Sequence, residues 1–232
     1  AAVMAAFKDA AAIPAGACFP HRLESVLALE NAMRVNPGDA RAPYYLGNFW
    51  YAHRRYAEAI TCWERSIALN ATNPTAHRNL GLAYWNKLNE AQKALQAYET
   101  AFRLDPTDAR VFFEMDQLYK KLNRNPAERL ALLEQHAELV SQRDDLTIER
   151  ISLLNLLGRH DEAFELLMAR NFHPWEGGEG KVTGQYVVCL VEKAKQHLAN
   201  QQPQDAIDCL EKAQVYPPNL GDVSAHLLRA ER

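Results

Sequence analysis

The sequence is short of the residue patterns that mark catalytic and metal-binding sites. None of its eight histidines stands three or four residues from another, and none of its four cysteines forms a CxxC pair. No Ser-His-Asp or Cys-His arrangement has a local signature. We therefore expect that the chain is not an enzyme and holds no metal and no cofactor. The cysteines are predicted to be small buried apolar side chains.

Excess charge and long apolar runs are also missing. The 26 Lys and Arg residues against 29 Asp and Glu residues leave a net charge of −3, so nothing favours nucleic acid or an anionic membrane as a partner. The apolar runs are far shorter than the roughly 20 residues of a membrane span. Residues 1–18 lack the basic start of a signal peptide and contain Asp9, so we expect a cytoplasmic protein. The chain starts without methionine and ends inside a helical pattern, which predicts a piece of a longer protein.

What the sequence does contain is a repeat. Residues 44–70 and 78–106 share residue types in register: the Leu-Gly pair at 46–47 recurs 34 residues later, and Ala59 and Trp63 are matched by a small and an aromatic residue 35 residues later. Apolar residues recur every three or four positions, and no segment predicts a strand. This pattern closely resembles the tetratricopeptide repeat. The resemblance implies an all-α solenoid of about five antiparallel helix pairs, a TPR-like superhelix.

Weaker copies of the repeat account for the rest of the chain. The stretch "RLESVLALENAMRVNP" resembles the second helix of a unit, and "PQDAIDCLEKAQVYP" closes a fifth one. We therefore predict a single solenoid over residues 1–232. Its parts are degenerate helices over 1–39, three units over 40–140 and two longer, divergent units over 141–232.

Glycines in the middle of predicted helices indicate close packing. Gly47 and Gly81 each cost about 1 kcal/mol relative to alanine, which is reasonable where a neighbouring helix approaches the backbone. Pro74 and Pro106 are predicted to start new helices, since a first helical residue needs no N–H. The rings predicted to fill the gaps between small residues are Trp50, Trp63, Tyr84 and Tyr98.

The glycine-rich stretch "PWEGGEGKVTGQ", residues 174–185, has two interpretations. It lacks P-loop spacing, because Trp175 and Val182 stand where glycine and Ser or Thr are needed. Residues 172–179 align with 215–222, which favours a joint between units, with a proline stop and glycines for left-handed turns. The alternative is contact with a ligand or partner, since two carboxylates and a tryptophan can process sugars. The residues of that contact would be His173, Trp175, Glu176 and Glu179.

The resemblance to tetratricopeptide proteins implies a partner on the concave face of the first helices. Some members clamp a C-terminal carboxylate at positions that correspond here to Tyr44, Asn48, Asn79, Arg110 and Glu114. Tyr44 replaces a lysine, and Glu114 puts a negative charge where the carboxylate would lie, so the match to the clamp is partial. The predicted groove is wider and consists of Tyr44, Asn48, Tyr51, Arg78, Asn79, Asn86, Arg110, Gln117 and Lys121. The alternative is that these groove residues are merely solvated side chains of the first helices.

A wider resemblance covers residues 41–222. The repeats followed by "FHPWEGGEGK" and "VYPPNLG" are similar to the helical-repeat region of large bacterial proteins of unknown function, in which a β-rich, carbohydrate-associated part precedes the repeats. The first hypothesis is a scaffold that binds a protein, a peptide or other domains of the same polypeptide. The alternative is an accessory module of a larger carbohydrate-active protein, with the 172–185 loop near a ligand. Self-association into a homo-oligomer through an apolar end is a third hypothesis.

Overall fold

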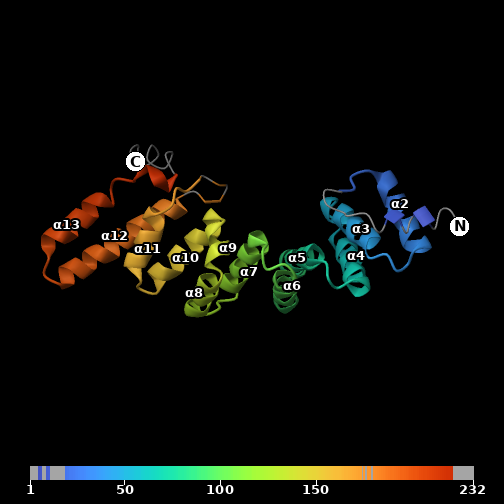
Figure 1. Cartoon of the computed structure of the whole chain (residues 1–232), viewed down its shortest axis with the longest axis horizontal. Coiled ribbons are helices and arrows are strands. Elements are labelled where there is room, and N and C mark those ends of the chain that lie inside the picture. Colours follow the sequence, from blue (N-terminus) through green and yellow to red (C-terminus); the bar gives the residue numbers. More distant parts are fainter. Residues whose placement is uncertain are drawn as a thin grey trace. The chain divides into compact units, whose positions relative to one another are not determined.

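The structure is a computed structural model that describes residues 5–6, 9–10, 19–173, 175, 177–178 and 180–221. All regular elements in this part of the chain are helices, and it contains no strand (Figure 1). The chain divides into two compact units, Ala1–Leu118 (unit 1) and Tyr119–Arg232 (unit 2), which are described separately. The predicted all-α solenoid of antiparallel helix pairs is confirmed, whereas the predicted boundaries after residues 39 and 140 stay predictions.

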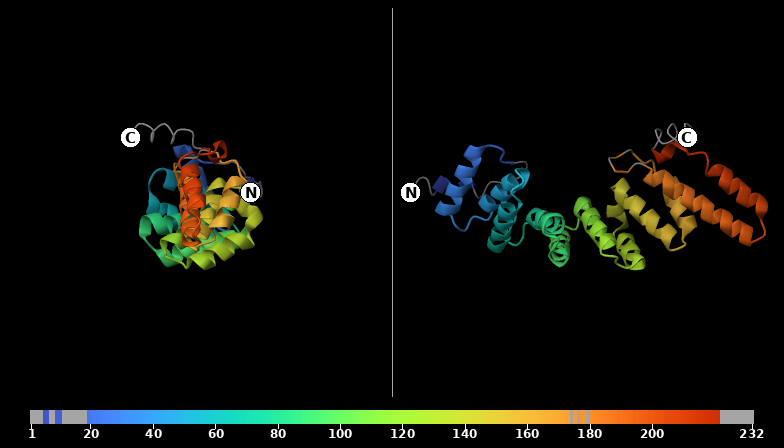
Figure 2. Two further views of the ribbon diagram at one scale, coloured as in Figure 1. Left: turned by 90° about the vertical axis from the view of Figure 1, so that its left-hand side faces the viewer. Right: turned by 180° about the vertical axis from the view of Figure 1, so that it is seen from behind.

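Unit 1 is built from consecutive helices that pack as neighbours. Helix α3 packs against α4, α5 packs against α6, and α2 covers α3, as Figure 2 shows from two further directions. The α5 helix continues into a π-helical turn, η1, and α7 begins in unit 1 and ends in unit 2. The elements are α2 (Leu23–Val35), α3 (Arg41–Ala52), α4 (Tyr56–Leu69), α5 (Pro74–Ala83), η1 (Tyr84–Leu88), α6 (Ala91–Leu104) and α7 (Ala109–Lys121).

Unit 2 continues the pattern of helix pairs, with one long helix, α12, of 19 residues. The helix pairs are α10 with α11 and α12 with α13, and a break at His136 separates α8 from α9. His136 stands where the preceding unit has the fully buried Ala101, and an imidazole does not fit the space of a methyl group. The elements are α8 (Pro126–Gln135), α9 (Ala137–Ser141), α10 (Asp144–Leu156), α11 (His160–Met168), α12 (Lys181–Ala199), α13 (Pro203–Lys212) and the 3₁₀ helix η2 (Pro218–Leu220).

The first helix of each described pair ends in the same turn. One residue takes the left-handed conformation with φ between 54° and 78°, and the next N–H donates at 2.9 to 3.0 Å to a carbonyl five residues earlier, or six residues earlier in the case of Glu90 after the π-helical turn η1. This is the Schellman motif, which satisfies carbonyls at a helix end. The left-handed residues are Arg54, Asn89, Asn123, Gly158 and Gln201. Their spacings of 35, 34, 35 and 43 residues confirm the predicted period and its lengthening in the last unit, where α12 has 19 residues.

Rings packed over glycine join the helices of a pair, as predicted. A Cβ atom added to Gly47 would lie 2.5 Å from the Trp63 ring, and one added to Gly81 would lie 2.8 Å from the Tyr98 ring. Such distances are far below van der Waals contact, so only glycine fits at either position. Three small residues of the second helices are also fully buried: Ala59, Ala94 and Ala101.

The two prolines predicted to start helices behave differently. Pro74 is the first residue of α5, and the Asn73 side chain caps that helix, which confirms the first prediction. The prediction for Pro106 is wrong, because this residue lies in the turn before α7. The Asp105 carboxylate holds that turn by accepting hydrogen bonds from the N–H and hydroxyl of the residue two positions on. Asp108 then caps α7 in the way that Asn73 caps α5.

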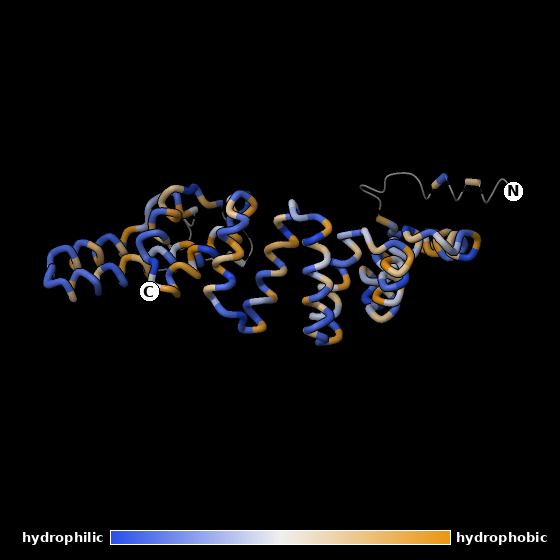
Figure 3. The backbone as a smooth tube through the Cα atoms, turned by 60° about the horizontal axis from the view of Figure 1, so that its bottom comes forward, coloured by the Kyte–Doolittle hydropathy of each residue, from blue (hydrophilic) through white to orange (hydrophobic). Residues whose placement is uncertain are grey.

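Helices of both units carry apolar residues on one side and polar residues on the other. Figure 3 shows hydrophobic and hydrophilic residues alternating along the helices, as expected for helices that bury a single face. Among the described residues, no helix combines the length and the hydrophobicity that crossing a membrane requires. In unit 1, one such buried face joins α2 to α3 through Val26, Leu46 and Phe49.

The cysteines largely follow the prediction. Cys189 and Cys209 are buried, whereas Cys62 is half-buried, and these three are free thiols; Cys18 lies outside the described residues. Burial raises the pKa of Cys62 to about 11 and raises that of Cys189 as well. The Cys62 thiol therefore stays protonated at neutral pH.

Candidate functional site

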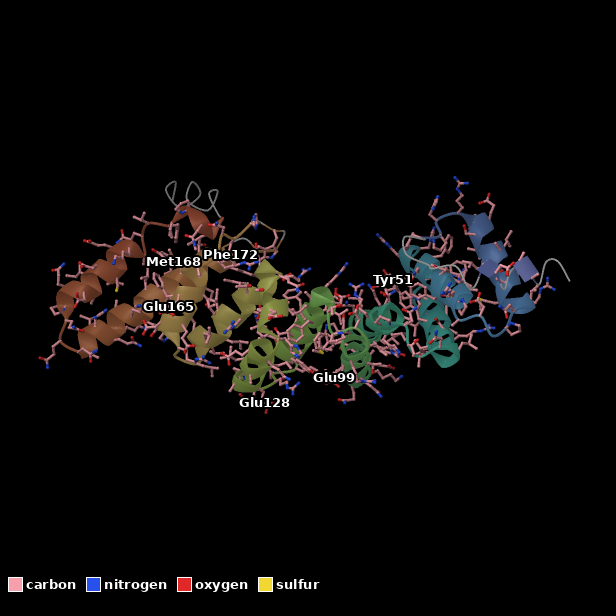
Figure 4. All side chains as sticks on the ribbon, viewed as in Figure 1. Tyr51, Glu99, Glu128, Glu165, Met168 and Phe172 are labelled. Atoms are coloured by element: carbon pink, nitrogen blue, oxygen red, sulfur yellow. The ribbon has the colours of Figure 1, made fainter. Side chains whose placement is uncertain are left out.

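The structure places eight of the nine predicted groove residues in unit 1. They come from α3, α5, η1 and α7, the first helices of three consecutive pairs, and Figure 4 labels one of them, Tyr51 on α3. Lys121, the ninth, belongs to unit 2. Asn86 and Arg110 are exposed, and the other six are half-buried. We call the unit 1 set the first-helix face: Tyr44, Asn48, Tyr51, Arg78, Asn79, Asn86, Arg110 and Gln117.

Asn48 is the centre of a hydrogen-bonded group that joins two helix pairs. Its Oδ1 atom accepts from Trp63 Nε1 at 3.0 Å and from Asn79 Nδ2 at 3.2 Å. Trp63 is buried, so Asn48 satisfies a donor that would otherwise be left unpaired. Within the described residues, the Asn48 Nδ2 atom donates to no protein acceptor, which leaves two amide hydrogens available on this face.

A second group centres on the carboxylate of Glu114. Arg78 donates to it twice, from Nε at 2.7 Å and from Nη2 at 2.5 Å, and Arg110 Nε donates at 3.1 Å. The hydrogen bonds with Glu114 raise the pKa of Arg78. Burial raises the pKa of Tyr98, and the negative charge of Glu114 raises it further. Arg78 and Tyr98 therefore keep their protons across the ordinary pH range.

Aromatic rings and an amide complete the face. The Tyr51 ring centroid lies 5.1 Å from that of Tyr56 and 5.4 Å from that of Trp63, and Lys87 Nζ lies 4.1 Å from the Tyr56 ring centroid. The Gln117 Nε2 atom is buried without a hydrogen-bond partner among the described residues. The face thus offers aromatic surface beside amide and guanidinium donors.

One support of this face was not foreseen from the sequence. Trp63 was predicted only to pack over glycine, but its indole N–H also donates to Asn48 of a first helix. The place of Trp63 in the repeat is the only sequence signal for it. The bond itself depends on which way the indole N–H points, and the spacing does not encode that.

The described residues of the glycine-rich stretch are engaged in the joint. A Cβ atom added to Gly178 would lie 2.3 Å from the Trp175 ring, and Gly177 and Gly180 take left-handed conformations. Phe172 N donates to the carbonyl of Asn219 at 2.8 Å, so the two aligned joint segments lie side by side. These contacts are those of a structural joint.

The structure describes only some of the residues that were predicted to contact a ligand in this stretch. His173 N donates to Asp144 Oδ2 at 2.8 Å, and its exposed ring lies 3.3 Å from the same oxygen. Burial raises the pKa of Asp144. The hydrogen bond from the His173 backbone N–H and the bond from the Arg170 guanidinium lower it by more, so the pKa of Asp144 lies below its ordinary value. Glu176 and Glu179 lie outside the described residues. Contact of this stretch with a ligand stays a prediction.

One pocket of about 300 Å³ lies between α4, α5 and α6 and contains none of the predicted site residues. Ile67 and His77 line it, together with residues of α6. One repeat later the equivalent positions are Phe102 and Phe112, whose rings stack with centroids 4.8 Å apart. The pocket is therefore the space left where smaller side chains replace that ring pair. Across the described residues, no three His, Cys, Asp or Glu side chains are arranged to hold a metal ion.

Family models of tetratricopeptide repeats match part of unit 1. Residues 23–66 match the family described as tetratricopeptide repeat, and residues 51–87 match that described as TPR repeat. YrrB, a TPR protein with an unusual peptide-binding site, is 19% identical with a TM-score of 0.58, over 89% of this chain and 98% of that one. PilF of Pseudomonas aeruginosa is 16% identical with a TM-score of 0.52, over 89% and 88%. A tetratricopeptide repeat protein from Parabacteroides merdae is 18% identical with a TM-score of 0.52, over 88% of each chain. At these identities the likenesses show the fold alone.

Proposed function

Because the chain carries tetratricopeptide repeats over residues 23–87, we propose that unit 1 binds a peptide or protein partner through its first-helix face. Stacked helical repeats present extended surfaces, and proteins built from them generally bind partners rather than catalyse reactions. YrrB, with its peptide-binding site, is an example of this fold in that role. The role as an interaction module follows from the repeats, and the choice of face is our proposal.

The observation that carries the proposal is the fixed row of donors on this face. Asn48 is held by Trp63 and by Asn79, so its amide hydrogens are oriented before any partner arrives. Within the described residues, Arg110 donates a hydrogen bond only through its Nε atom, to Glu114. Its side chain is 64% exposed, so both of its Nη groups are available to a partner. Donors that are already ordered lose little entropy when they bind.

These groups fit an extended segment of polypeptide. Backbone carbonyls of such a segment are left unpaired along its length, and amide and guanidinium donors satisfy them without selecting a sequence. The half-buried rings of Tyr44 and Tyr51 add apolar contact area for every second side chain of such an extended segment. The partner class that this face supports best is therefore an unfolded or extended protein segment.

A random peptide display library selected against the wild-type chain tests the proposal. The face variant is Asn79→Ala with Arg110→Ala, which removes two donors of the face. Asn48 keeps its hydrogen bond from Trp63, and Glu114 keeps those from Arg78. The matched control is Gln92→Ala with Arg103→Ala on α6, which removes an exposed amide and an exposed guanidinium from a second helix. Isothermal titration of the selected peptides compares the Kd values.

We expect the face variant to bind at least about 10-fold more weakly, which corresponds to about 1.4 kcal/mol. The α6 control should bind like the wild type. Equal affinity of the face variant, or a loss confined to the α6 variant, contradicts the proposed face. The alternative function as an accessory carbohydrate module rests on the 172–185 loop and stays a prediction.

A further inference from the structure

The Glu114 carboxylate is already engaged by two guanidinium groups. It accepts two hydrogen bonds from Arg78 and one from Arg110, which use three of the about four acceptor positions of a carboxylate. The side chains of Arg78 and Glu114 are each only 17% exposed, so their bidentate pair lies largely out of water. A bidentate guanidinium–carboxylate pair is among the stronger polar contacts that proteins form.

Without Glu114, the two arginines would form a site for a free anion. Arg78 and Arg110 would present two guanidinium groups directed at one point on the face. Two guanidinium cations around one point are the chemistry that binds a carboxylate. The protein fills this site with a side chain of its own.

We propose that Glu114 occupies an anion site from within the chain and so excludes partners that bring a carboxylate to this part of the first-helix face. The inference rests on the proposed function of that face. Glu114 is fixed on α7, so its carboxylate acts at an effective concentration that a free ligand does not reach. An incoming carboxylate must displace it and meets its negative charge in a partly buried place.

The consequence is a selection among partners. The Asn48 amide hydrogens and the free Nη groups of Arg110 remain available to backbone carbonyls of a partner. An internal segment of a polypeptide supplies carbonyls without a carboxylate, whereas a chain end supplies the excluded group. Glu114 therefore makes the face selective for internal segments over free C-termini.

Anion rescue tests the filled site without any knowledge of the partner. The variant Glu114→Ala leaves Arg78 without its counterion and opens space for a small carboxylate. Its Tm should fall in sodium chloride and recover by several degrees in sodium acetate of equal ionic strength. Wild type should show no acetate-specific shift. If Glu114→Ala is unfolded in chloride, acetate should restore its helical circular dichroism signal.

Two further variants separate a site from a general salt effect. Glu58→Ala removes the partner of Arg55 in an exposed pair, so acetate has no enclosed site to fill and its Tm should not recover. Glu114→Gln keeps the volume of the side chain, so it leaves no room for acetate and should also show no recovery. Equal behaviour of Glu114→Ala in the two salts, or equal acetate shifts in all variants, overturns the proposal.

A binding measurement tests the selection itself. N-acetyl-glycylglycine with a free carboxylate and the same compound as its amide are titrated into each protein and followed by NMR shifts. Glu114→Ala should bind the carboxylate at least about 10-fold more tightly than the amide, and the wild type should not prefer it. A wild type with the same preference overturns the proposal. Neither the anion rescue nor this titration uses the displayed peptides. Failure of the filled-site proposal is therefore distinguishable from failure of the proposal that the first-helix face binds a partner.

Discussion

At the scale of single residues, two glycines in helices should respond to the same substitution in opposite directions. Gly47→Ala places a methyl group 2.5 Å from the Trp63 ring, which is buried and held by a hydrogen bond to Asn48. The expected loss from overpacking is about 1–3 kcal/mol, which exceeds the gain of about 1 kcal/mol in helix propensity. Gly184→Ala in α12 meets nothing within 4 Å, so it should stabilise by about 1 kcal/mol.

Urea unfolding followed by circular dichroism measures both changes. A rise in the unfolding midpoint for Gly47→Ala would mean that the Trp63 ring moves aside at little cost, contrary to the packing described above. A fall for Gly184→Ala would contradict the open space around this position of α12.

Residues of the candidate site were predictable only up to a point. The repeat places Asn48, Asn79 and Arg110 on first helices, and the period suffices for that because each occupies a known helical position. The contact between Arg78 and Glu114 joins residues 36 positions apart on different helices, and its geometry depends on the rotation of each helix about its axis. Composition and spacing do not determine that rotation. Trp63 illustrates the same limit, since its ring packing was predictable and the bond from its indole N–H was not.

At the scale of elements, the turn between paired helices carries a specific conformational cost. Gln201 adopts φ 59° between α12 and α13, and a non-glycine residue in this region costs about 1–2 kcal/mol. Gln201→Gly should therefore stabilise by roughly 1 kcal/mol, after part of the gain is offset by the greater entropy of glycine in the unfolded chain. Thermal or urea unfolding measures the shift.

The equivalent turn between α10 and α11 allows the opposite substitution, from glycine to alanine. Gly158→Ala introduces a Cβ at φ 78° in the equivalent turn between α10 and α11, with nothing within 4 Å to add a steric contribution. It should destabilise by about 1–2 kcal/mol. If both substitutions leave the unfolding midpoint unchanged, the left-handed conformation of these turns does not limit stability.

The sequence predicted these elements well because periodicity and turn chemistry agree. Asn89, Asn123 and Gly158 are residue types that tolerate a positive φ, so they mark the helix ends locally. Arg54 and Gln201 carry no such signal, and only the register of the repeat places them. Pro106 misled the analysis because proline suits both a turn and a first helical position, and the side chain of Asp105 decides between the two.

At the scale of the whole molecule, most tertiary contacts join helices that are near neighbours in sequence. A protein of this kind behaves as a row of coupled units, in which a local change spreads to adjacent units and then decays. Asn155 tests this behaviour, because it is buried in unit 2 and bonds to α12 through Gln185 at 2.9 Å and Cys189 at 3.2 Å. His160 of α11 lies 3.0 Å from its Oδ1 atom.

Asn155→Ala leaves these polar groups without a partner, which should cost about 1–3 kcal/mol. Hydrogen exchange measured by mass spectrometry should then become faster in α10, α11 and α12. Protection in α3, α4 and α5 should stay at the wild-type level, because the change reaches them only through several intervening helices, and the coupling weakens at each. Faster exchange along the entire chain would show instead that both units unfold as one cooperative body, and the substitutions proposed for unit 1 would then report on the stability of unit 2 as well.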